Sequence, residues 1–275
     1  SIGLDYGSLS GRAVLIDIAD GRQLCDCVMD YPHAVMSETL AATGAPLPPD
    51  YALQDPQDYL DVLATTIPGV IKKSGIDPRD IVGIGVDFTC CTLLPVHRDG
   101  TPLCFDEQYR GEPHAYVKLW KHHAAQSYAD RLNEVARRRG EPWLDRFGGK
   151  ISSEWMFPKI WQVLDERPDI YDAADYFIEA GDWVTWQLTG RQTRGYCFAA
   201  YKSSFVVDGG GYPSEDFFGE LDERLRHVVR DKLDAPMVFT GERAGTVCHR
   251  AAEWLGLPEG AAVACPMPDA HTATI

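Results

Sequence analysis

The stretch GLDYGSLSGR, residues 3–12, decides how the chain begins to fold, because it leads from one apolar segment through a Gly- and Ser-rich turn into a second. A strong two-residue hairpin signal follows at Asp20-Gly21. We therefore predict three short strands, at residues 1–7, 11–18 and 22–31, the last of which alternates apolar and polar residues. Together they form an antiparallel meander, whereas a simple dinucleotide-binding unit would pass from its first strand into a helix.

The turn within residues 3–12 has the chemistry of a phosphate site. Gly and Ser expose backbone N–H groups on the concave side of a tight turn, and such a nest binds phosphate oxygens. Asp5 ends the first strand and is a candidate ligand for Mg²⁺, which prefers oxygen, while Arg12 is a candidate partner for a phosphate. From these residues alone a plain hairpin with an exposed acid is favoured, since the turn matches neither of the common Gly-rich nucleotide motifs.

Two more acids follow segments that are predicted to be buried strands. GIGVDF at 83–88 contains Asp87 at its end, and AAVAC at 261–265 is followed by Asp269. Ligands of open α/β sheets bind beyond the carboxyl ends of strands, so both acids are site candidates. The alternatives are an acid that caps the next turn, for Asp87, and an ordinary turn residue, for Asp269.

The rest of the chain predicts an α/β domain with a helical insertion at about 110–190. Asp55 and Pro56 are an N-cap and a first helical residue, Pro68 should kink the helix, and Gly75 should end it. Helical periodicity then indicates helices within the insertion and after it, at residues 113–126, 128–140, 158–174, 175–190, 222–233 and 251–256.

Composition excludes several classes of function. The 275 residues carry a formal net charge of −15, which argues against a nucleic-acid or anionic-membrane surface, although local amides, one Arg and a divalent ion can still hold a phosphate. Eight cysteines without a C-x-x-C pair indicate reduced, mostly buried thiols in a cytoplasmic protein. No apolar stretch approaches about 20 residues, so we expect no membrane span, and the first residues predict no signal peptide.

The pattern Asp-x-Gly-Ser-x-x-x-Arg resembles the first phosphate loop of the actin-like ATPase fold, a ribonuclease H-like α/β fold with a mixed sheet. Within that fold, DYGSLSGRA at residues 5–13 is most similar to the FGGY family of carbohydrate kinases. The resemblance implies that Asp5 lies near the metal and that the loop, through Gly7, Ser8 and Arg12, touches the phosphates of ATP. Ser8 stands where many members of the family have Thr, and the hydroxyl is retained.

Four further segments resemble the ribulokinase branch of this family: GVDFTCCT (85–92), LWKHHAAQ (119–126), GGKISSEWMFPK (148–159) and GDWVTWQLTG (181–190). The resemblance implies that Asp87 organises the metal and phosphate region. It also implies that Thr89 and Cys91 line the sugar site and that Trp120 lies against the sugar. Without the resemblance, an aromatic residue at helical spacing is more often core, and His122-His123 is a solvated pair.

In FAAYKSS, residues 198–204, Lys202 follows a run of small residues. A lone lysine is usually at the surface, but the resemblance implies that Lys202 donates hydrogen bonds to the oxygens of a ketopentose. Asp269-Ala270-His271 matches the family's catalytic segment, where the Asp is the base. Such a carboxylate orients the sugar hydroxyl and accepts its proton during phosphoryl transfer.

FGGY kinases have two similar lobes with ATP between them. The resemblance covers residues 1–275 and implies that this chain is the N-terminal lobe, without the C-terminal lobe that holds the adenosine pocket, and therefore inactive alone. The expected reaction transfers the γ-phosphate of ATP, with Mg²⁺, to the 5-hydroxyl of L-ribulose. A homodimer is left open.

Other functions remain open at this point. A kinase for D-ribulose or xylulose would share most of these residues. A non-catalytic actin-like ATPase or scaffold would lack a sugar pocket with a lysine and a base. A degenerate sugar sensor is disfavoured because Asp5, Asp87 and Asp269 are all retained.

Overall fold

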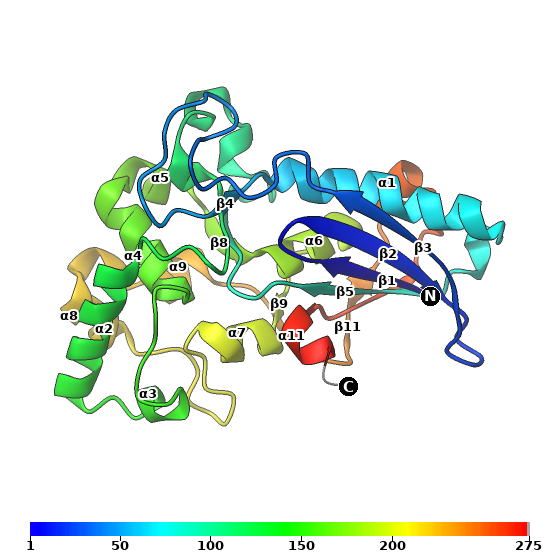
Figure 1. The fold of residues 1–275 in the computed structure, drawn as a ribbon. Helices are drawn as coiled ribbons and strands as arrows, with labels where there is room; N and C mark the ends of the chain where they lie inside the picture. The colour runs from blue at the N-terminus through cyan, green and yellow to red at the C-terminus, as the bar shows by residue number, and fades with distance from the viewer. Residues whose placement is uncertain (274–275) are drawn as a thin grey trace.

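The computed structural model describes residues 1–273 and has two parts that share one continuous chain (Figure 1). In one part, an open sheet is covered by helices that include α1. In the other, helices α2, α4, α5 and α8 gather around a smaller sheet. Each part has its own cluster of buried apolar side chains. Within the described residues, no helix is both long and apolar enough to span a bilayer.

The chain opens with the antiparallel meander that the sequence predicts. Its strands are β1 (Ile2–Tyr6), β2 (Ser10–Ile16) and β3 (Gln23–Asp30), and β2 pairs with both neighbours. Along β1, alternate residues are buried, beginning with Ile2, while Gly3 and Asp5 face the other side of the sheet. The period-two pattern therefore sets which side of the sheet receives the acid.

The other strands extend this meander into a mixed sheet, which confirms the predicted fold class. Within residues 1–273 it contains seven strands, of which six follow the order β11-β12-β5-β1-β2-β3. The strands β5 and β12 run parallel to β1, β11 is antiparallel to β12, and β13 pairs with the carboxyl end of β5. Their bounds are β5 (Gly83–Phe88), β11 (Arg243–Thr246), β12 (Ala262–Ala264) and β13 (Met267–Pro268).

Three helices cover one face of this sheet: α1 (Pro56–Ser74), α6 (Ala180–Thr189) and α10 (His249–Leu255). The predicted limits of α1 are confirmed, because the side chain of Asp55 accepts from Gln57 N and Gly75 ends the helix in a left-handed conformation. The helix continues through Pro68, and the kink there stays a prediction. Gly11 lets α1 approach closely, since a Cβ at this position would lie 2.6 Å from Val62 Cγ1.

The second part is built on an antiparallel sheet in the order β4-β7-β6-β8. Its strands are β4 (Leu53–Gln54), β6 (Leu93–Val96), β7 (Val117–Lys118) and β8 (Tyr176–Glu179). Around it lie α2 (Gln126–Arg139), α3 (Trp143–Arg146), α4 (Met156–Glu166), α5 (Pro168–Ala173), α8 (Glu215–Leu221) and α9 (Val228–Lys232).

Short elements complete the fold. Two of them, α7 (Tyr196–Lys202) and α11 (Asp269–Thr272), carry predicted site residues, and the strands β9 (Arg194–Gly195) and β10 (Met237–Val238) pair in parallel. The 3₁₀ turns lie at Pro78–Asp80, Leu103–Phe105, Glu107–Tyr109, Pro113–Ala115 and Glu223–Leu225.

Four of the predicted helices are wrong in part. Residues 158–174 are divided at Arg167 into α4 and α5, because Pro168 begins a new helix. Residues 113–126 form a 3₁₀ turn, the strand β7 and further turns, because Val117 and Lys118 pair with β4 and β6 instead of continuing a helix. Residues 176–179 form β8, which pairs with β6 before α6 begins. The segment 222–233 is divided into a 3₁₀ turn and α9, since the side chain of Asp222 caps the 3₁₀ turn by accepting from Arg224 N.

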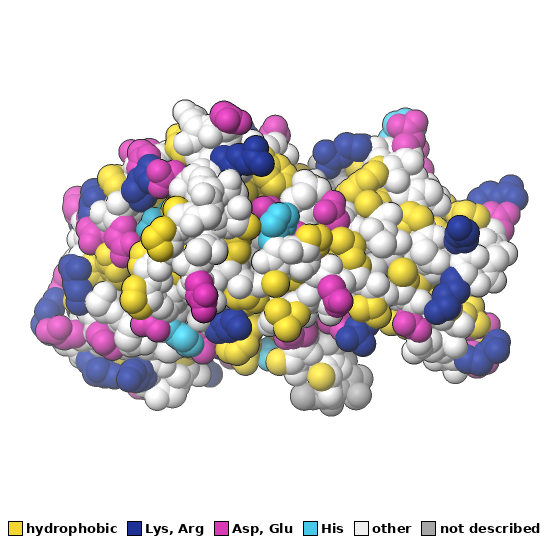
Figure 2. Space-filling model, turned by 45° about the horizontal axis from the view of Figure 1, so that its top comes forward, with side chains coloured by type: hydrophobic (Ala, Val, Ile, Leu, Met, Phe, Trp, Pro, Cys, Tyr) yellow, Lys and Arg dark blue, Asp and Glu magenta, His cyan; other side chains and the backbone are white. Residues whose placement is uncertain are grey.

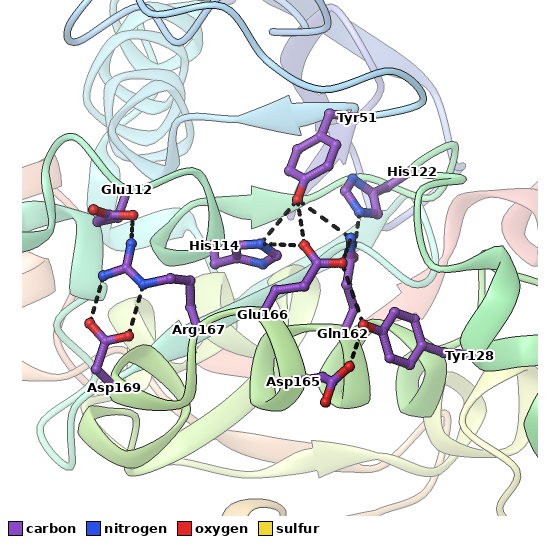
Figure 3. A network of polar contacts seen from close by, with 10 residues as sticks. All are labelled: Tyr51, Glu112, His114, His122, Tyr128, Gln162, Asp165, Glu166, Arg167 and Asp169. Atoms are coloured by element: carbon purple, nitrogen blue, oxygen red, sulfur yellow. Dashed lines mark hydrogen bonds and ion pairs between the residues drawn. The ribbon is translucent and has the colours of Figure 1, made fainter.

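A network of polar side chains ties α4 to the loops above it (Figure 3). The carboxylate of Glu166 accepts from Tyr51 at 3.1 Å, from His114 at 3.0 Å and from Gln162 at 3.2 Å. Burial alone would raise the pKa of Glu166, but these hydrogen bonds outweigh it and lower the pKa to about 2. His122 extends the network through Gln162 Oε1 at 2.9 Å. The second part is thus held by hydrogen bonds as well as by its apolar cluster.

Asp182 in α6 gives a pH-dependent prediction. It is fully buried, accepts from Gly195 N at 2.9 Å, and burial raises its pKa to about 7. The folded protein therefore binds a proton that the unfolded chain has released between pH 3.8 and 7, and stability falls as pH rises through this window. Asn does not titrate. As the pH rises from 4 to 8, the free energy of unfolding of Asp182→Asn should therefore increase by at least about 1 kcal/mol relative to that of the unaltered protein.

Chemical unfolding at a series of pH values measures this gain. The exposed acid Asp172 provides the control, and Asp172→Asn should not reproduce this gain. Parallel stability curves for Asp182→Asn and the unaltered protein would show that Asp182 ionises normally in the fold.

Candidate active site

Three carboxylates that are distant in the sequence meet at one edge of the large sheet. Asp5 and Asp87 are direct partners on the parallel strands β1 and β5, and Met267 of β13 is also a partner of Asp87. The chain then turns at Pro268 into α11, which begins with Asp269. The three acids line an open pocket of about 530 Å³ together with Ala270, Thr272 and Ala273. Strand pairing therefore brings together the acids that sequence reasoning singled out.

The environment of Asp87 resists a negative charge. Burial raises its pKa to about 7, and the neighbouring Asp5 adds to this shift. Thr272 Oγ1 donates to Asp87 Oδ2 at 3.1 Å, whereas Asp87 Oδ1 is buried and has no hydrogen-bond partner among residues 1–273. Burial also raises the pKa of Asp269, although the amide of Ala270, 2.6 Å from Oδ1, opposes the shift. A bound cation or an additional hydrogen-bond donor would therefore stabilise the ionised form of these carboxylates.

The residues fit a hydrated magnesium ion better than a fully enclosed metal. Within the part of the chain that the structure describes, no group of three or more His, Cys, Asp or Glu side chains is arranged to hold a metal ion. Mg²⁺ usually keeps several waters and takes one or two carboxylates together with substrate phosphates. The paired Asp5 and Asp87, with an unpartnered buried oxygen on Asp87, match this requirement.

The turn between β1 and β2 lies against this acidic pocket. Arg12 Nε is 3.1 Å from Asp5 Oδ2, so the arginine partly neutralises the acid pair. Gly7 N donates to Ser10 O at 3.0 Å and closes the turn. The hydroxyl of Ser8 accepts from Trp120 Nε1 at 3.0 Å. Ser8, which is predicted to bind the phosphates, and Trp120, which is predicted to lie against the sugar, are therefore in direct contact.

The loop after β5 carries the next two predicted residues. Thr89 and Thr92 share a hydrogen bond between their hydroxyls at 2.7 Å. Cys91 is buried and has a φ of +52°, which L-residues other than Gly seldom adopt. Its Sγ donates to Lys202 O at 3.6 Å, so this loop also contacts the end of α7.

The ammonium of Lys202 contacts Glu154 Oε2 at 2.5 Å, and the lysine is absent from the lining of the acidic pocket. Burial alone would lower the pKa of Lys202, but the hydrogen bond with Glu154 outweighs it and raises the pKa. Tyr201, the residue before Lys202, has its ring centroid 4.6 Å from that of His271 in α11. The end of α7 therefore packs beside the helix that begins with Asp269.

Sequence reasoning missed three residues that shape this region: Glu154, Thr272 and Lys159. Glu154 and Lys159 lie within a segment that was used for resemblance alone, and Thr272 follows the segment that contains Asp269. One signal was present for Lys159, because it is a charged residue on an otherwise apolar stretch of helix. No pattern indicated the partners of Glu154 and Thr272, which come from distant segments.

The chain belongs to the FGGY family of carbohydrate kinases, whose N-terminal domain matches residues 1–275. A ribulokinase from Geobacillus thermodenitrificans is 52% identical over 272 residues, covering 99% of this chain and 48% of the relative. A ribulokinase from Mycolicibacterium smegmatis is 50% identical over 273 residues, with coverage of 98% and 48%. The chain thus spans about half the length of the curated relatives it matches.

Solved structures show the same fold. A xylulose kinase from Rhodospirillum rubrum has a TM-score of 0.76 at 19% identity, and the match covers 99% of this chain and 49% of that one. A glycerol kinase from Plasmodium falciparum, solved with ADP, has a TM-score of 0.69 at 13% identity, with the same coverage. These likenesses confirm the actin-like ATPase fold. The sequence identities are too low to indicate the substrate.

Proposed function

We propose that this chain is the N-terminal lobe of an ATP-dependent ribulokinase, which transfers the γ-phosphate of ATP to the 5-hydroxyl of L-ribulose. The meeting of Asp5, Asp87 and Asp269 at one pocket carries the proposal, since phosphoryl transfer needs a base and anchored phosphates in the same place. Family membership and relatives named ribulokinase at about half identity support the choice of substrate.

In this proposal Asp269 is the base. It orients the sugar hydroxyl toward the γ-phosphate and accepts its proton, and its raised pKa favours proton acceptance. Asp5 and Asp87 would hold Mg²⁺, which neutralises phosphate charge when bound. At the β1–β2 turn Ser8 would donate its hydroxyl hydrogen to the phosphates, while Gly7 keeps the turn closed through its bond to Ser10 O. Arg12 would divide its charge between Asp5 and a phosphate.

The sugar would lie on the side of Asp269 that is opposite to the metal and the phosphates. Cys91 and Thr89 form one wall through the loop after β5, and Trp120 forms a second wall that is tied to Ser8. Lys202 would donate to the sugar oxygens while Glu154 holds its ammonium in place. The ring contact between Tyr201, next to Lys202, and His271, in the helix that begins with Asp269, supports a single pocket for these groups.

We further propose that a C-terminal lobe follows residue 275 in the full-length protein and supplies the adenosine pocket. The length of the curated relatives, about twice that of this chain, supports this division.

We assign the enzyme to the cytoplasm because all eight cysteines are free. On the face drawn in Figure 2, Asp and Glu side chains lie between the Lys and Arg side chains. This face therefore offers nucleic acid no continuous basic surface. A homodimer is compatible with the proposal but is not required.

A coupled assay of ADP release by the full-length protein tests this function. With Mg²⁺ and ATP, L-ribulose should give the highest kcat/KM in a panel with D-ribulose, D-xylulose and L-xylulose. A preference for another ketopentose would change the substrate and leave the kinase class intact. ADP release that none of the sugars stimulates would refute the proposal and favour an actin-like ATPase or scaffold.

A further inference from the structure

We propose that Lys159 is a positioning residue that sets the spacing between two walls of the sugar pocket. This inference rests on the proposed function, because the two walls are the segments that carry Cys91 and Trp120. Lys159 lies in α4 and touches neither the acidic pocket nor its three carboxylates. It acts through the backbone that it binds.

The ammonium of Lys159 joins two loops that are far apart in the sequence. Its Nζ donates to Cys91 O at 2.6 Å and to Leu119 O at 2.8 Å. The first carbonyl belongs to a predicted pocket residue, and the second directly precedes Trp120. Since the side chain is fully buried, water does not compete for these bonds. One cation therefore fixes the distance between the loop after β5 and the loop after β7.

The loop at Cys91 needs such support. A non-Gly residue at a φ of +52° is strained and persists only where the surroundings hold it. Lys159 holds the carbonyl of Cys91, while Glu179 Oε2 accepts from the next amide, Thr92 N, at 3.2 Å. The two buried side chains thus hold both polar groups of a single peptide, the one that joins Cys91 to Thr92.

A purely space-filling role would not need a cation. Lys118, in β7, is also fully buried, yet its Nζ has no hydrogen-bond partner within residues 1–273 and lies over the ring of Tyr51. Lys159 differs because both of its bonds end on pocket-bearing backbone. Loss of its ammonium would leave the buried carbonyl of Cys91 without its donor, while Leu119 O would keep only the bond from His122 N at 2.9 Å. The loop at Cys91 would then be free to move. A displacement near 1 Å can cost about a hundredfold in catalysis.

Steady-state kinetics of the full-length protein test the inference. Lys159→Met keeps the apolar stem and removes the two hydrogen bonds, so we expect the KM for L-ribulose to rise about 10- to 100-fold. The KM for ATP should rise much less than the KM for sugar, because Lys159 reaches the β1–β2 turn only indirectly, through Trp120 and its bond to Ser8. Lys118→Met is the matched control and should leave both KM values unchanged.

Lys159→Gln covers the case in which the Met variant fails to fold, since an amide can still donate to one carbonyl. If both variants fold, the KM of Lys159→Gln for L-ribulose should lie between that of the unaltered protein and that of Lys159→Met. If only Lys159→Gln folds, its KM should still exceed that of the unaltered protein. An unaltered sugar KM in either variant, or an equal rise in the KM values of sugar and ATP, would overturn the positioning role.

Hydrogen–deuterium exchange gives a readout that does not depend on activity. In Lys159→Met, or in the Gln variant, amides of residues 88–93 and 118–121 should exchange faster, while those of β2 and β3 should keep their protection. Failure of the unaltered protein to phosphorylate L-ribulose would contradict the proposed function. The exchange rates would still show whether Lys159 holds the two loops. Unchanged exchange in both segments would refute the positioning role.

Discussion

Asp269→Asn in the full-length protein is expected to lower kcat by about two to four orders of magnitude, the usual contribution of a general base. The amide keeps the size of the side chain and can still accept from Ala270 N, so local structure should persist. It cannot take the proton of the sugar hydroxyl. The affinity for L-ribulose should therefore change only a few-fold, because the remaining sugar contacts come from other elements.

Turnover from the coupled assay and sugar affinity from titration calorimetry separate these two effects. The exposed acid Asp208, in the loop after α7, provides the control, and Asp208→Asn should behave like the unaltered protein. Near-normal turnover of Asp269→Asn would remove Asp269 from catalysis. Loss of sugar binding with unchanged kcat at saturation would instead make it a binding residue.

Lys202→Met is expected to raise the KM for L-ribulose about 10- to 100-fold, the range for loss of a charged hydrogen bond. The KM for ATP should be little affected, since the ammonium of Lys202 pairs with Glu154 and the lysine is absent from the lining of the acidic pocket.

Glu154→Gln separates binding from a structural ion pair. If Lys202 only pairs with Glu154, removing either partner should have the same effect. If Lys202 binds sugar, Glu154→Gln keeps the ammonium and should raise the sugar KM clearly less than Lys202→Met does. Equal effects of the two substitutions on sugar KM and on thermal stability would contradict a sugar-binding role for Lys202.

The sequence predicted the elements whose signals are local. Asp20-Gly21 and the period-two pattern identified the meander, and Asp55 with Gly75 marked the ends of α1. The resemblance implied that Asp5 and Asp87 share the metal and phosphate region, and the local strand signals were confirmed for both segments. Such features depend on turn, cap and alternation preferences that act over a few residues.

Features that depend on distant partners were not predictable in this way. Residues 113–126 have helical periodicity, but pairing of Val117 with β4 overrides it. The hydrogen bond from Trp120 to Ser8 and the two bonds of Lys159 join segments from different parts of the chain. No spacing within one segment encodes these contacts. Resemblance to a family located the site residues, and the structure supplied their partners.

A crystal structure of the full-length protein with L-ribulose, Mg²⁺ and ADP would test the central claim most directly. We predict that the 5-hydroxyl of the sugar lies within hydrogen-bond distance of Asp269, that the sugar ring or chain packs on Trp120, and that the metal lies between Asp5, Asp87 and the phosphates. A sugar bound away from Asp269, or a nucleotide whose phosphates lie far from the β1–β2 turn, would contradict the proposed active site.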